Sequence, residues 1–128
     1  MHTIAHGIDL IRVERIRGML ERHDDRFLER VFTPSEQAYA KGRKRAAEHL
    51  AARFAAKEAV FKALGTGLRE GMAFTDIEVV LRPSGEPTIQ LSGEVARVAQ
   101  SRGITGWLVS LSHTDTDAIA SVIGLGAS

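Results

Sequence analysis

The first thirty residues pass from a strand-like apolar run to helical spacing. Residues 4–10 form a short, largely apolar stretch that predicts a strand. Apolar residues then recur every three or four positions, which predicts a helix with a buried stripe at Val13, Ile16, Met19 and Leu20. The junction between the two elements is expected just after Asp9, so that a carboxylate is presented where the strand ends.

The middle of the chain predicts two more helices. Thr33, Pro34 and Glu36 combine a hydroxyl cap, a proline at the first helical position and a glutamate three residues after the cap. A short helix is therefore expected to begin here. Residues 46–64 are rich in Ala, Leu, Glu, Lys and Arg and contain no Gly or Pro, which predicts one long helix.

The last part of the chain returns to strand-like spacing. Apolar residues alternate with others over 77–81, and a second extended run at 88–91 follows a Pro-Ser-Gly turn signal, which predicts a hairpin. A further short helix is expected at 92–100, and two strands at 107–112 and 118–124. Helices concentrated early and antiparallel strands late predict an α+β fold in one domain, residues 1–128.

The composition narrows the possible functions. The 128 residues carry 17 basic and 16 acidic side chains, so the overall charge does not favour nucleic acid, and no nucleic-acid partner is expected. The absence of cysteine excludes disulfides, thiolate metal sites and a cysteine nucleophile, and it fits a reducing cytoplasm. No apolar run approaches the roughly 20 residues that span a bilayer, so we expect a cytoplasmic protein without membrane contact.

The predicted long helix and the residues after it carry the densest set of candidate functional groups. Glu58 and Lys62 lie one helical turn apart beside Phe54, so a carboxylate and an ammonium project next to an aromatic ring. An ordinary surface ion pair between Glu58 and Lys62 explains the same spacing. Gly65 and Gly67 likewise have a simple structural explanation, since glycines commonly end helices.

Asp9 has two interpretations at the predicted strand-to-helix junction. It can cap the helix by accepting hydrogen bonds from free backbone N–H groups. It can also be a ligand of Mg²⁺, which typically takes one or two protein carboxylates together with phosphate oxygens and water. Glu58 would supply the second carboxylate if the fold brings the two residues together.

Ser110, Ser112 and His113 lie at the end of a predicted strand, an arrangement that superficially suggests a serine hydrolase. The G-x-S-x-G turn of such enzymes is absent, and no catalytic triad can be argued from these residues. We therefore do not predict hydrolase activity.

The predicted first helix carries a stripe of basic residues. Spacings of four, three and four place four side chains on one helical face, with an apolar residue among arginines: Arg15, Met19, Arg22 and Arg26. The stripe is either a solvated helix face or a docking surface for an acidic helical partner, in which arginines steer and Met19 makes adaptable apolar contact.

Five segments occur in a fixed order along the chain. They are H-G-I-D-L at 6–10 followed by Arg15, F-T-P-S-E at 32–36, R-F-A-A-K-E-A to G-T-G at 53–67, D-I-E-V at 76–79, and S-L-S-H-T at 110–114. Together they resemble the holo-acyl-carrier-protein synthase branch of the 4′-phosphopantetheinyl transferases, and the match spans nearly the whole chain. The resemblance implies that family's α+β fold, with an antiparallel sheet packed against one long and several short helices.

The resemblance also implies roles for individual residues. It implies that Asp9 and Glu58 hold Mg²⁺ and that, with Lys62, they form the catalytic set. Coenzyme A would be the substrate, and the implied contacts to it come from Arg53, Phe54, Lys62, Gly65, Gly67, Pro87, Ser112, His113 and Thr114. The stripe of Arg15, Met19, Arg22 and Arg26 would dock apo acyl carrier protein.

The implied reaction is attack by a carrier-protein serine on the β-phosphate of coenzyme A, which releases adenosine 3′,5′-bisphosphate and supports fatty acid biosynthesis. The group that accepts the serine proton stays open between Glu58 and a water oriented by Glu58 or Asp9. The resemblance to short members of this branch implies a homotrimer in which each site lies between neighbouring subunits, so a homotrimer is expected. Two alternatives remain: a broader transferase for secondary-metabolite carrier proteins, and a non-catalytic binder of an acidic partner.

Overall fold

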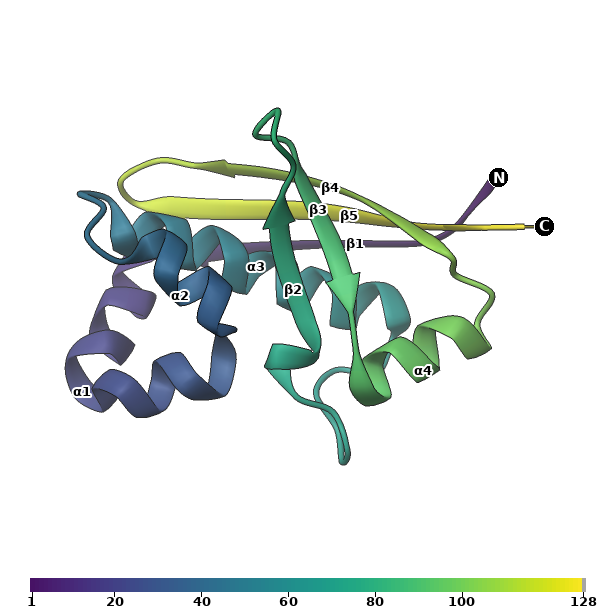
Figure 1. The fold of residues 1–128 in the computed structure, drawn as a ribbon, viewed down its shortest axis with the longest axis horizontal. Coiled ribbons are helices and arrows are strands. Elements are labelled where there is room, and N and C mark those ends of the chain that lie inside the picture. Colours follow the sequence, from purple (N-terminus) through teal and green to yellow (C-terminus); the bar gives the residue numbers. More distant parts are fainter. Residues whose placement is uncertain (128) are drawn as a thin grey trace.

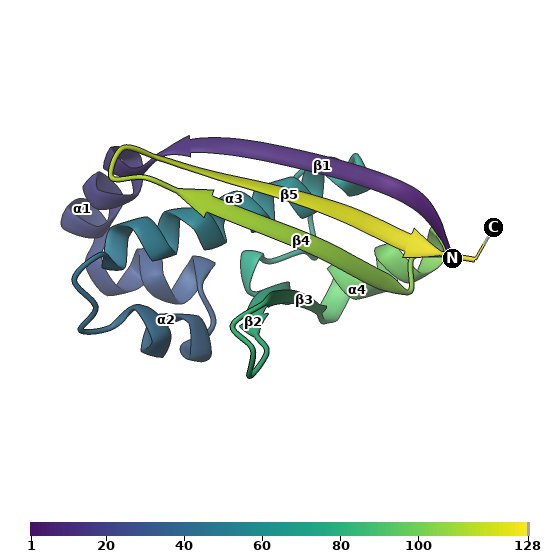
Figure 2. The same cartoon turned by 90° about the horizontal axis from the view of Figure 1, so that it is seen from above.

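The computed structural model describes residues 1–127, apart from the side chain of Asp24. Its largest layer is an antiparallel sheet of β1 (His2–Arg12), β4 (Gly106–His113) and β5 (Asp117–Gly126), in the order β1-β5-β4. Figures 1 and 2 show these three strands side by side, with both chain termini at one end of the sheet. The first and last strands of the chain are therefore direct neighbours.

The helix α3 (Ala46–Leu64) runs along one face of this sheet (Figure 2). It is buried on nearly every side, because the sheet covers one side while other helices and a hairpin cover the rest. Its alanines allow the neighbouring backbones to come close. A Cβ atom built on Gly7 of β1 would lie 1.9 Å from the carbonyl oxygen of Ala59, so β1 lies directly against α3 at this point.

Two helices pack beside one end of α3, namely α1 (Val13–Val31) and α2 (Pro34–Ala40). The predicted start of α2 is confirmed, since Thr33 Oγ1 accepts from the N–H of Glu36 while the N–H of Thr33 donates to Glu36 Oε1. Within residues 1–127, no helix is both long enough and apolar enough to cross a membrane.

A second, smaller sheet is the hairpin of β2 (Ile77–Leu81) and β3 (Pro87–Leu91), which the sequence predicts. A 3₁₀ turn, η1 (Phe74–Asp76), leads into it, and α4 (Gly93–Ser101) follows it. In Figure 1 the hairpin crosses the long strands, and α1 and α4 lie at opposite ends of the molecule.

The α+β class is confirmed, and the long helix has the bounds that the sequence predicts. The predicted junction after Asp9 is wrong. Strand β1 continues for three more residues because it stays paired with β5 as far as Arg12, which lies opposite Asp117. Helix α1 then begins at Val13.

The sheet face that points away from α3 carries exposed apolar side chains. Alternate residues of the strands point to this side, and the exposed fractions are 50% for Ile8, 66% for Leu10, 54% for Leu108 and 37% for Ile119. Leu10 lies opposite Ile119 in the register of β1 and β5, and Leu108 lies opposite Ile123 further along the same sheet face. An apolar area of this kind on a sheet face is typical of a protein interface.

Candidate active site

Strand β1 and helix α3 bring together the three residues that the sequence singles out for catalysis. Asp9 shares the α3-facing side of β1 with Gly7 and Ile11. Its Oδ1 atom lies 2.8 Å from Lys62 Nζ, with exposed side-chain fractions of 14% and 56% respectively. The close approach of Gly7 to α3 therefore places Asp9 beside the C-terminal turns of that helix.

Glu58 lies close enough to Asp9 for their charges to interact. Burial raises the pKa of Glu58, and the negative charge of Asp9 raises it further, whereas Arg15 and Lys62 oppose the shift. The hydrogen bond from Lys62 to Asp9 raises the pKa of the Lys62 ammonium. Two carboxylates and two cationic groups thus meet at one place on the surface of the molecule.

This donor set fits a hard divalent cation. The two carboxylates, Asp9 and Glu58, repel one another, and a cation between them would relieve that repulsion. Among the described residues, no group of three or more His, Cys, Asp or Glu side chains forms a closed metal cage. An ion bound here would complete its shell with water and substrate oxygens, as Mg²⁺ commonly does.

Two structural interpretations made from the sequence are wrong. Asp9 does not cap α1, because it lies inside β1 and the N-cap residue is Arg12, whose side chain makes no capping hydrogen bond. Glu58 and Lys62 do not form the expected surface ion pair, because Lys62 reaches across to Asp9 on the neighbouring strand.

A hollow of about 420 Å³ contains further predicted residues. Arg53 of α3, Pro87 at the start of β3 and His113 at the end of β4 all line it, together with Tyr39. Arg53 is only 4% exposed, and its Nε is a buried donor without a hydrogen-bond partner among residues 1–127. His113 Nδ1 is held 2.9 Å from Glu48 Oε1. Arg53 thus places a guanidinium in the wall of the hollow, and a guanidinium there is a candidate group for binding an anion.

Other predicted coenzyme contacts lie apart from this hollow. Ser112 points to the opposite sheet face from His113, since side chains alternate along β4. Thr114 Oγ1 accepts from the N–H groups of Thr116 and Asp117 and so stabilises the turn before β5. The structure therefore does not bring Ser112 and Thr114 to the hollow with His113.

Gly65 and Gly67 end α3 as the sequence predicts. Both have positive φ, 72° and 61°, and the N–H of Gly65 donates to the carbonyl oxygen of Lys62. This left-handed conformation favours glycine, and both Gly65 and Gly67 are exposed.

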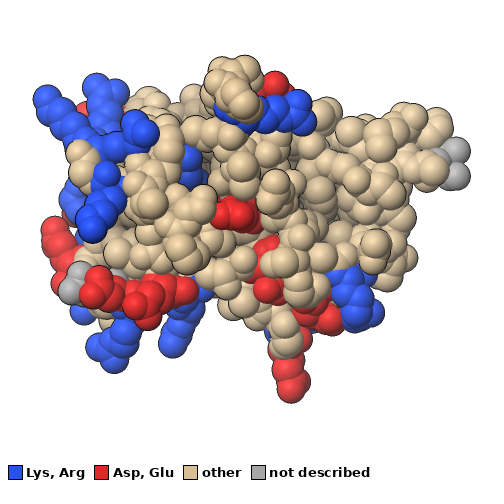
Figure 3. All heavy atoms as spheres, viewed as in Figure 1, with Lys and Arg blue, Asp and Glu red and all other residues tan. Residues whose placement is uncertain are grey.

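The basic stripe borders a second hollow, of about 530 Å³, between α1 and α3. Arg15, Met19 and Arg26 line it with Phe54 and Phe74, whereas Arg22 lies outside. The Arg22 guanidinium instead contacts the Met19 sulfur at 3.6 Å. Figure 3 shows Lys and Arg concentrated at the end of the molecule that carries α1 and α2. The hollow therefore combines an apolar floor with a basic rim, and we call it the α1 groove.

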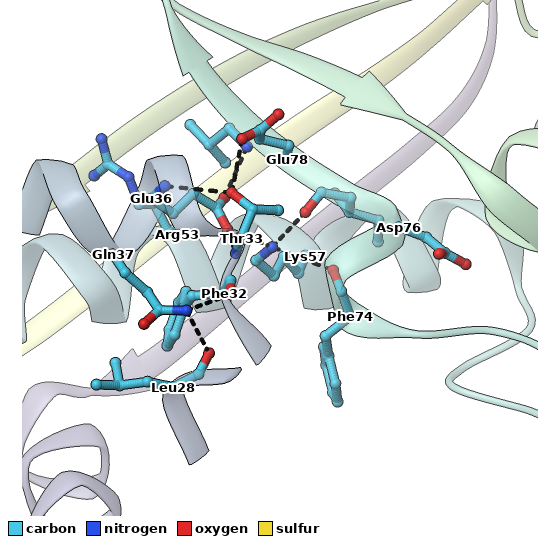
Figure 4. A network of polar contacts seen from close by, with 12 residues as sticks. Leu28, Phe32, Thr33, Glu36, Gln37, Arg53, Lys57, Phe74, Asp76 and Glu78 are labelled. Atoms are coloured by element: carbon cyan, nitrogen blue, oxygen red, sulfur yellow. Dashed lines mark hydrogen bonds and ion pairs between the residues drawn. The ribbon is translucent and has the colours of Figure 1, made fainter. Parts of the chain in front are cut away.

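One buried ion pair in the structure is not among the features predicted from the sequence. Lys57 Nζ lies 2.8 Å from Glu36 Oε1, and both side chains have no exposed surface (Figure 4). Both residues occur in recognised motifs, but Glu36 was explained by its capping box alone. The sequence does contain a signal for this pair. Apolar residues are spread around nearly the whole circumference of α3, which indicates that a lysine in the middle of the helix is buried.

Comparisons with known proteins agree with this architecture. Residues 5–119 match the family described as the 4′-phosphopantetheinyl transferase superfamily, and the chain belongs to it. A protein of Desulforudis audaxviator named holo-[acyl-carrier-protein] synthase is 52% identical, over 95% of this chain and 92% of that one. A protein of Koribacter versatilis with the same name is 48% identical, over 94% and 96%. The family resemblance inferred from the five segments is confirmed.

Solved structures show the same fold. The holo-[acyl-carrier-protein] synthase of Helicobacter pylori in complex with coenzyme A has a TM-score of 0.82 and 33% identity, covering 94% of this chain and 99% of that one. The Bacillus anthracis enzyme, in complex with CoA (3′,5′-ADP), has a TM-score of 0.79 and 38% identity, covering 98% of both chains.

Proposed function

We propose that this protein transfers 4′-phosphopantetheine from coenzyme A to a serine of apo acyl carrier protein and releases adenosine 3′,5′-bisphosphate. Relatives named holo-[acyl-carrier-protein] synthase align over nearly the whole chain and support the proposal. The solved structure of a relative in complex with coenzyme A supports it as well. The observation that carries it is the meeting of Asp9, Glu58 and Lys62 between β1 and α3. The product, holo acyl carrier protein, supports fatty acid biosynthesis in the cytoplasm.

Coenzyme A is proposed to lie between this charged site and the Arg53 hollow. Arg53 and His113 would contact its phosphates and 3′-phosphoadenosine end, because both side chains line the hollow. Phe54 and the exposed backbone at Gly65 and Gly67 would border the part near the reacting phosphate. Pro87, Ser112 and Thr114 remain proposed contacts, the last two from a neighbouring subunit.

Mg²⁺ is the metal that we propose for Asp9 and Glu58, and it would supply charge neutralisation on the diphosphate of coenzyme A. The Lys62 ammonium, held by Asp9, is placed to offset charge that develops on the phosphate or leaving group. Glu58 is one proposed acceptor of the serine proton, because it lies at the site where the charges of Asp9 and Lys62 act on it. A water oriented by Glu58 or Asp9 is the alternative.

We propose that the working form is a homotrimer of one-domain subunits, residues 1–128. The exposed apolar sheet face, with Ile8, Leu10, Leu108 and Ile119, supports contact with other copies of the chain. The short chain resembles one half of longer, fused relatives, so each complete site would lie between two subunits. Ser112 points outward from that same sheet, which is compatible with a contribution to a neighbouring site.

Carrier protein is proposed to dock on the stripe of Arg15, Met19, Arg22 and Arg26. The α1 groove supports this proposal, since a basic rim around an apolar floor fits an acidic helix with apolar residues at its centre. Docking there would bring the carrier serine toward Glu58, whose charge interacts with Arg15 of the same stripe.

The test of the proposed function is a mass-spectrometric assay with apo acyl carrier protein, coenzyme A and Mg²⁺. We expect the carrier mass to increase by one phosphopantetheine group, and omission of the metal to prevent the increase. An unchanged carrier mass would contradict the proposal and favour a non-catalytic binder. Rates on several apo carriers separate a dedicated enzyme from a transferase of broader specificity.

A further inference from the structure

Two of the recognised segments, F-T-P-S-E and D-I-E-V, have no part in the proposed reaction, yet both meet around Lys57 (Figure 4). Lys57 precedes Glu58 on α3 but points into the interior, with 0% of its side chain exposed. Its ammonium pairs with Glu36, which is equally buried. The other oxygen of Glu36 accepts from the N–H of Val79 at 2.8 Å, so the pair joins α2, α3 and β2.

The Lys57 ammonium uses all three of its donors. One goes to Glu36, one to the carbonyl oxygen of Phe74 at 3.2 Å, and one to the carbonyl oxygen of Ile77. Phe74 begins η1 and Ile77 follows its last residue. A single buried cation therefore holds both ends of the η1 turn against α3.

The η1 turn carries a ring that forms the floor of the α1 groove. The Phe74 ring stacks on Phe54 with centroids 5.5 Å apart and meets Phe61 edge-on at 5.5 Å. Phe54 in turn lies 5.7 Å from the guanidinium of Arg15. The position of the Phe74 backbone thus fixes a continuous layer that extends to the rim of the groove.

Stability alone is a weak reason for such a pair. Moving two charges into the interior is costly, and replacing a buried ion pair by neutral residues of similar volume is often neutral or stabilising. The contacts of Lys57 to two carbonyl oxygens are specific to the η1 turn and would be lost in such a replacement.

We infer that Lys57 is a positioning residue for carrier-protein binding: it holds the η1 turn so that Phe74 and Phe54 form the floor of the docking groove. The inference rests on the proposed docking of carrier protein at the α1 groove. Lys57 contacts neither substrate nor metal in this arrangement. Phe54 itself belongs to α3, so its proposed contact with coenzyme A does not depend on the η1 turn. The effect of Lys57 should therefore appear in the KM for carrier protein and leave the use of coenzyme A intact.

The experiment compares three variants with the wild-type enzyme, with each substrate varied in turn. Glu36→Gln/Lys57→Met removes both buried charges, and Phe74→Ala removes the floor directly. Glu94→Gln/Arg97→Met is the matched control, since it removes an ion pair of the same charges from the exposed surface of α4. All assays are run well below the thermal midpoint of the least stable variant, so that each KM is measured on folded protein.

We expect the KM for carrier protein to rise about tenfold in both Glu36→Gln/Lys57→Met and Phe74→Ala, with the KM for coenzyme A unchanged within about twofold. The α4 control should match the wild type. If the Glu36/Lys57 variant keeps a wild-type carrier KM while Phe74→Ala does not, Lys57 is only structural and the inference is wrong. If Phe74→Ala also keeps a wild-type KM, the groove is not the docking site and the docking proposal fails with it. Equal losses for both substrates would also contradict the inference.

Discussion

At the residue scale, the candidate site depends on pairs of side chains that are distant in sequence. Asp9 and Lys62 are joined across two elements, and Glu58 is influenced by Asp9 through space. The chemistry of each residue can be predicted from its type and its motif. Their actual partners cannot, because spacing along a helix favours the Glu58–Lys62 pair until the neighbouring strand is placed.

Removing either carboxylate should abolish transfer without unfolding the protein. Asp9→Ala and Glu58→Ala each take away half of the proposed metal-binding pair, and neither residue fills the apolar core. We expect rates at least about 100-fold below wild type in the mass-spectrometric assay, with a circular dichroism spectrum unchanged. Glu70→Ala, at an exposed position, is the control and should retain activity. Near-normal metal-supported activity in either site variant would contradict the assignment.

His49 should make the protein less stable as the pH falls. Burial lowers its pKa below the usual histidine value of 6.5, and charge interactions with His113, Arg53 and Arg43 lower it further while Glu48 opposes the shift. The unfolded histidine therefore binds a proton at a higher pH than the folded one. Unfolding takes up a proton in the window just below pH 6.5, so stability decreases as the pH decreases through that window.

The variant His49→Phe tests this prediction. It keeps an aromatic ring against Tyr39 and His113, whose ring centroids lie 5.4 and 5.3 Å from that of His49, but it cannot be protonated. Thermal midpoints measured between pH 5 and 7.5 should fall less steeply for His49→Phe than for the wild type. Parallel curves for the two proteins would show that His49 is not the group responsible.

At the element scale, local sequence predicts α3 well and the end of β1 poorly. Helix-favouring residues and a terminal glycine define α3 within the sequence itself. Whether Ile11 and Arg12 belong to a strand or a helix is decided by β5, more than 100 residues later. The role of Lys57 likewise cannot be predicted from local sequence, because its partners lie in other elements. They are Glu36 of α2, Phe74 of η1 and Ile77 of β2.

The contact between β1 and α3 predicts a strong effect of Gly7→Ala. The added Cβ would lie 1.9 Å from the carbonyl oxygen of Ala59, so the strand must move away from the helix and carry Asp9 with it. We expect a loss of about 1–3 kcal/mol in the free energy of unfolding, measured by denaturant titration, and a large loss of activity.

Gly18→Ala is the control for this prediction. Gly18 lies within α1, and the nearest atoms to its added Cβ belong to the flexible side chain of Arg22. Alanine favours the helix over glycine by about 1 kcal/mol, so this variant should be at least as stable as the wild type. If Gly7→Ala is as stable as the wild type, the prediction that the contact between β1 and α3 leaves no room for a Cβ atom at position 7 is wrong.

The stripe on α1 predicts a salt-sensitive carrier interaction. Charge reversal in Arg15→Glu or Arg22→Glu should raise the KM for carrier protein, and the wild-type KM should itself rise with salt, since exposed charges are screened within roughly 8 Å at physiological ionic strength. The KM for coenzyme A should change little. Arg22 gives the cleaner result, because Arg15 also interacts with Glu58.

Arg17→Glu provides a matched reversal on the same helix. Arg17 pairs with Glu14 at 2.8 Å and lies outside the stripe, so its variant should leave the carrier KM near wild type. Steady-state kinetics with each substrate varied separately distinguish the cases. An unchanged carrier KM in both Arg15→Glu and Arg22→Glu would show that the stripe is a solvated helix face.

At the scale of the whole molecule, the exposed sheet face predicts assembly. An exposed apolar area lies on the face of the main sheet that points away from α3. It consists of Ile8, Leu10, Leu108 and Ile119. Burying this area against other copies would remove it from water at a gain of about 25 cal/mol per Å². Light scattering should therefore show an assembly, and the proposed homotrimer predicts three times the monomer mass.

The variants Leu10→Glu and Ile119→Glu test whether that face joins the subunits and whether activity requires the trimer. Each places a charge within the apolar area, where burial against another subunit would be costly, so the trimer should dissociate at assay concentration. If residues from a neighbouring subunit complete the site for coenzyme A, activity should fall together with the trimer fraction and recover at high protein concentration. The exposed substitution Gln90→Glu on β3 is the control for added charge and should remain trimeric. A fully active monomer would contradict the interface-site proposal, and a trimer that survives both substitutions would place the subunit contact elsewhere.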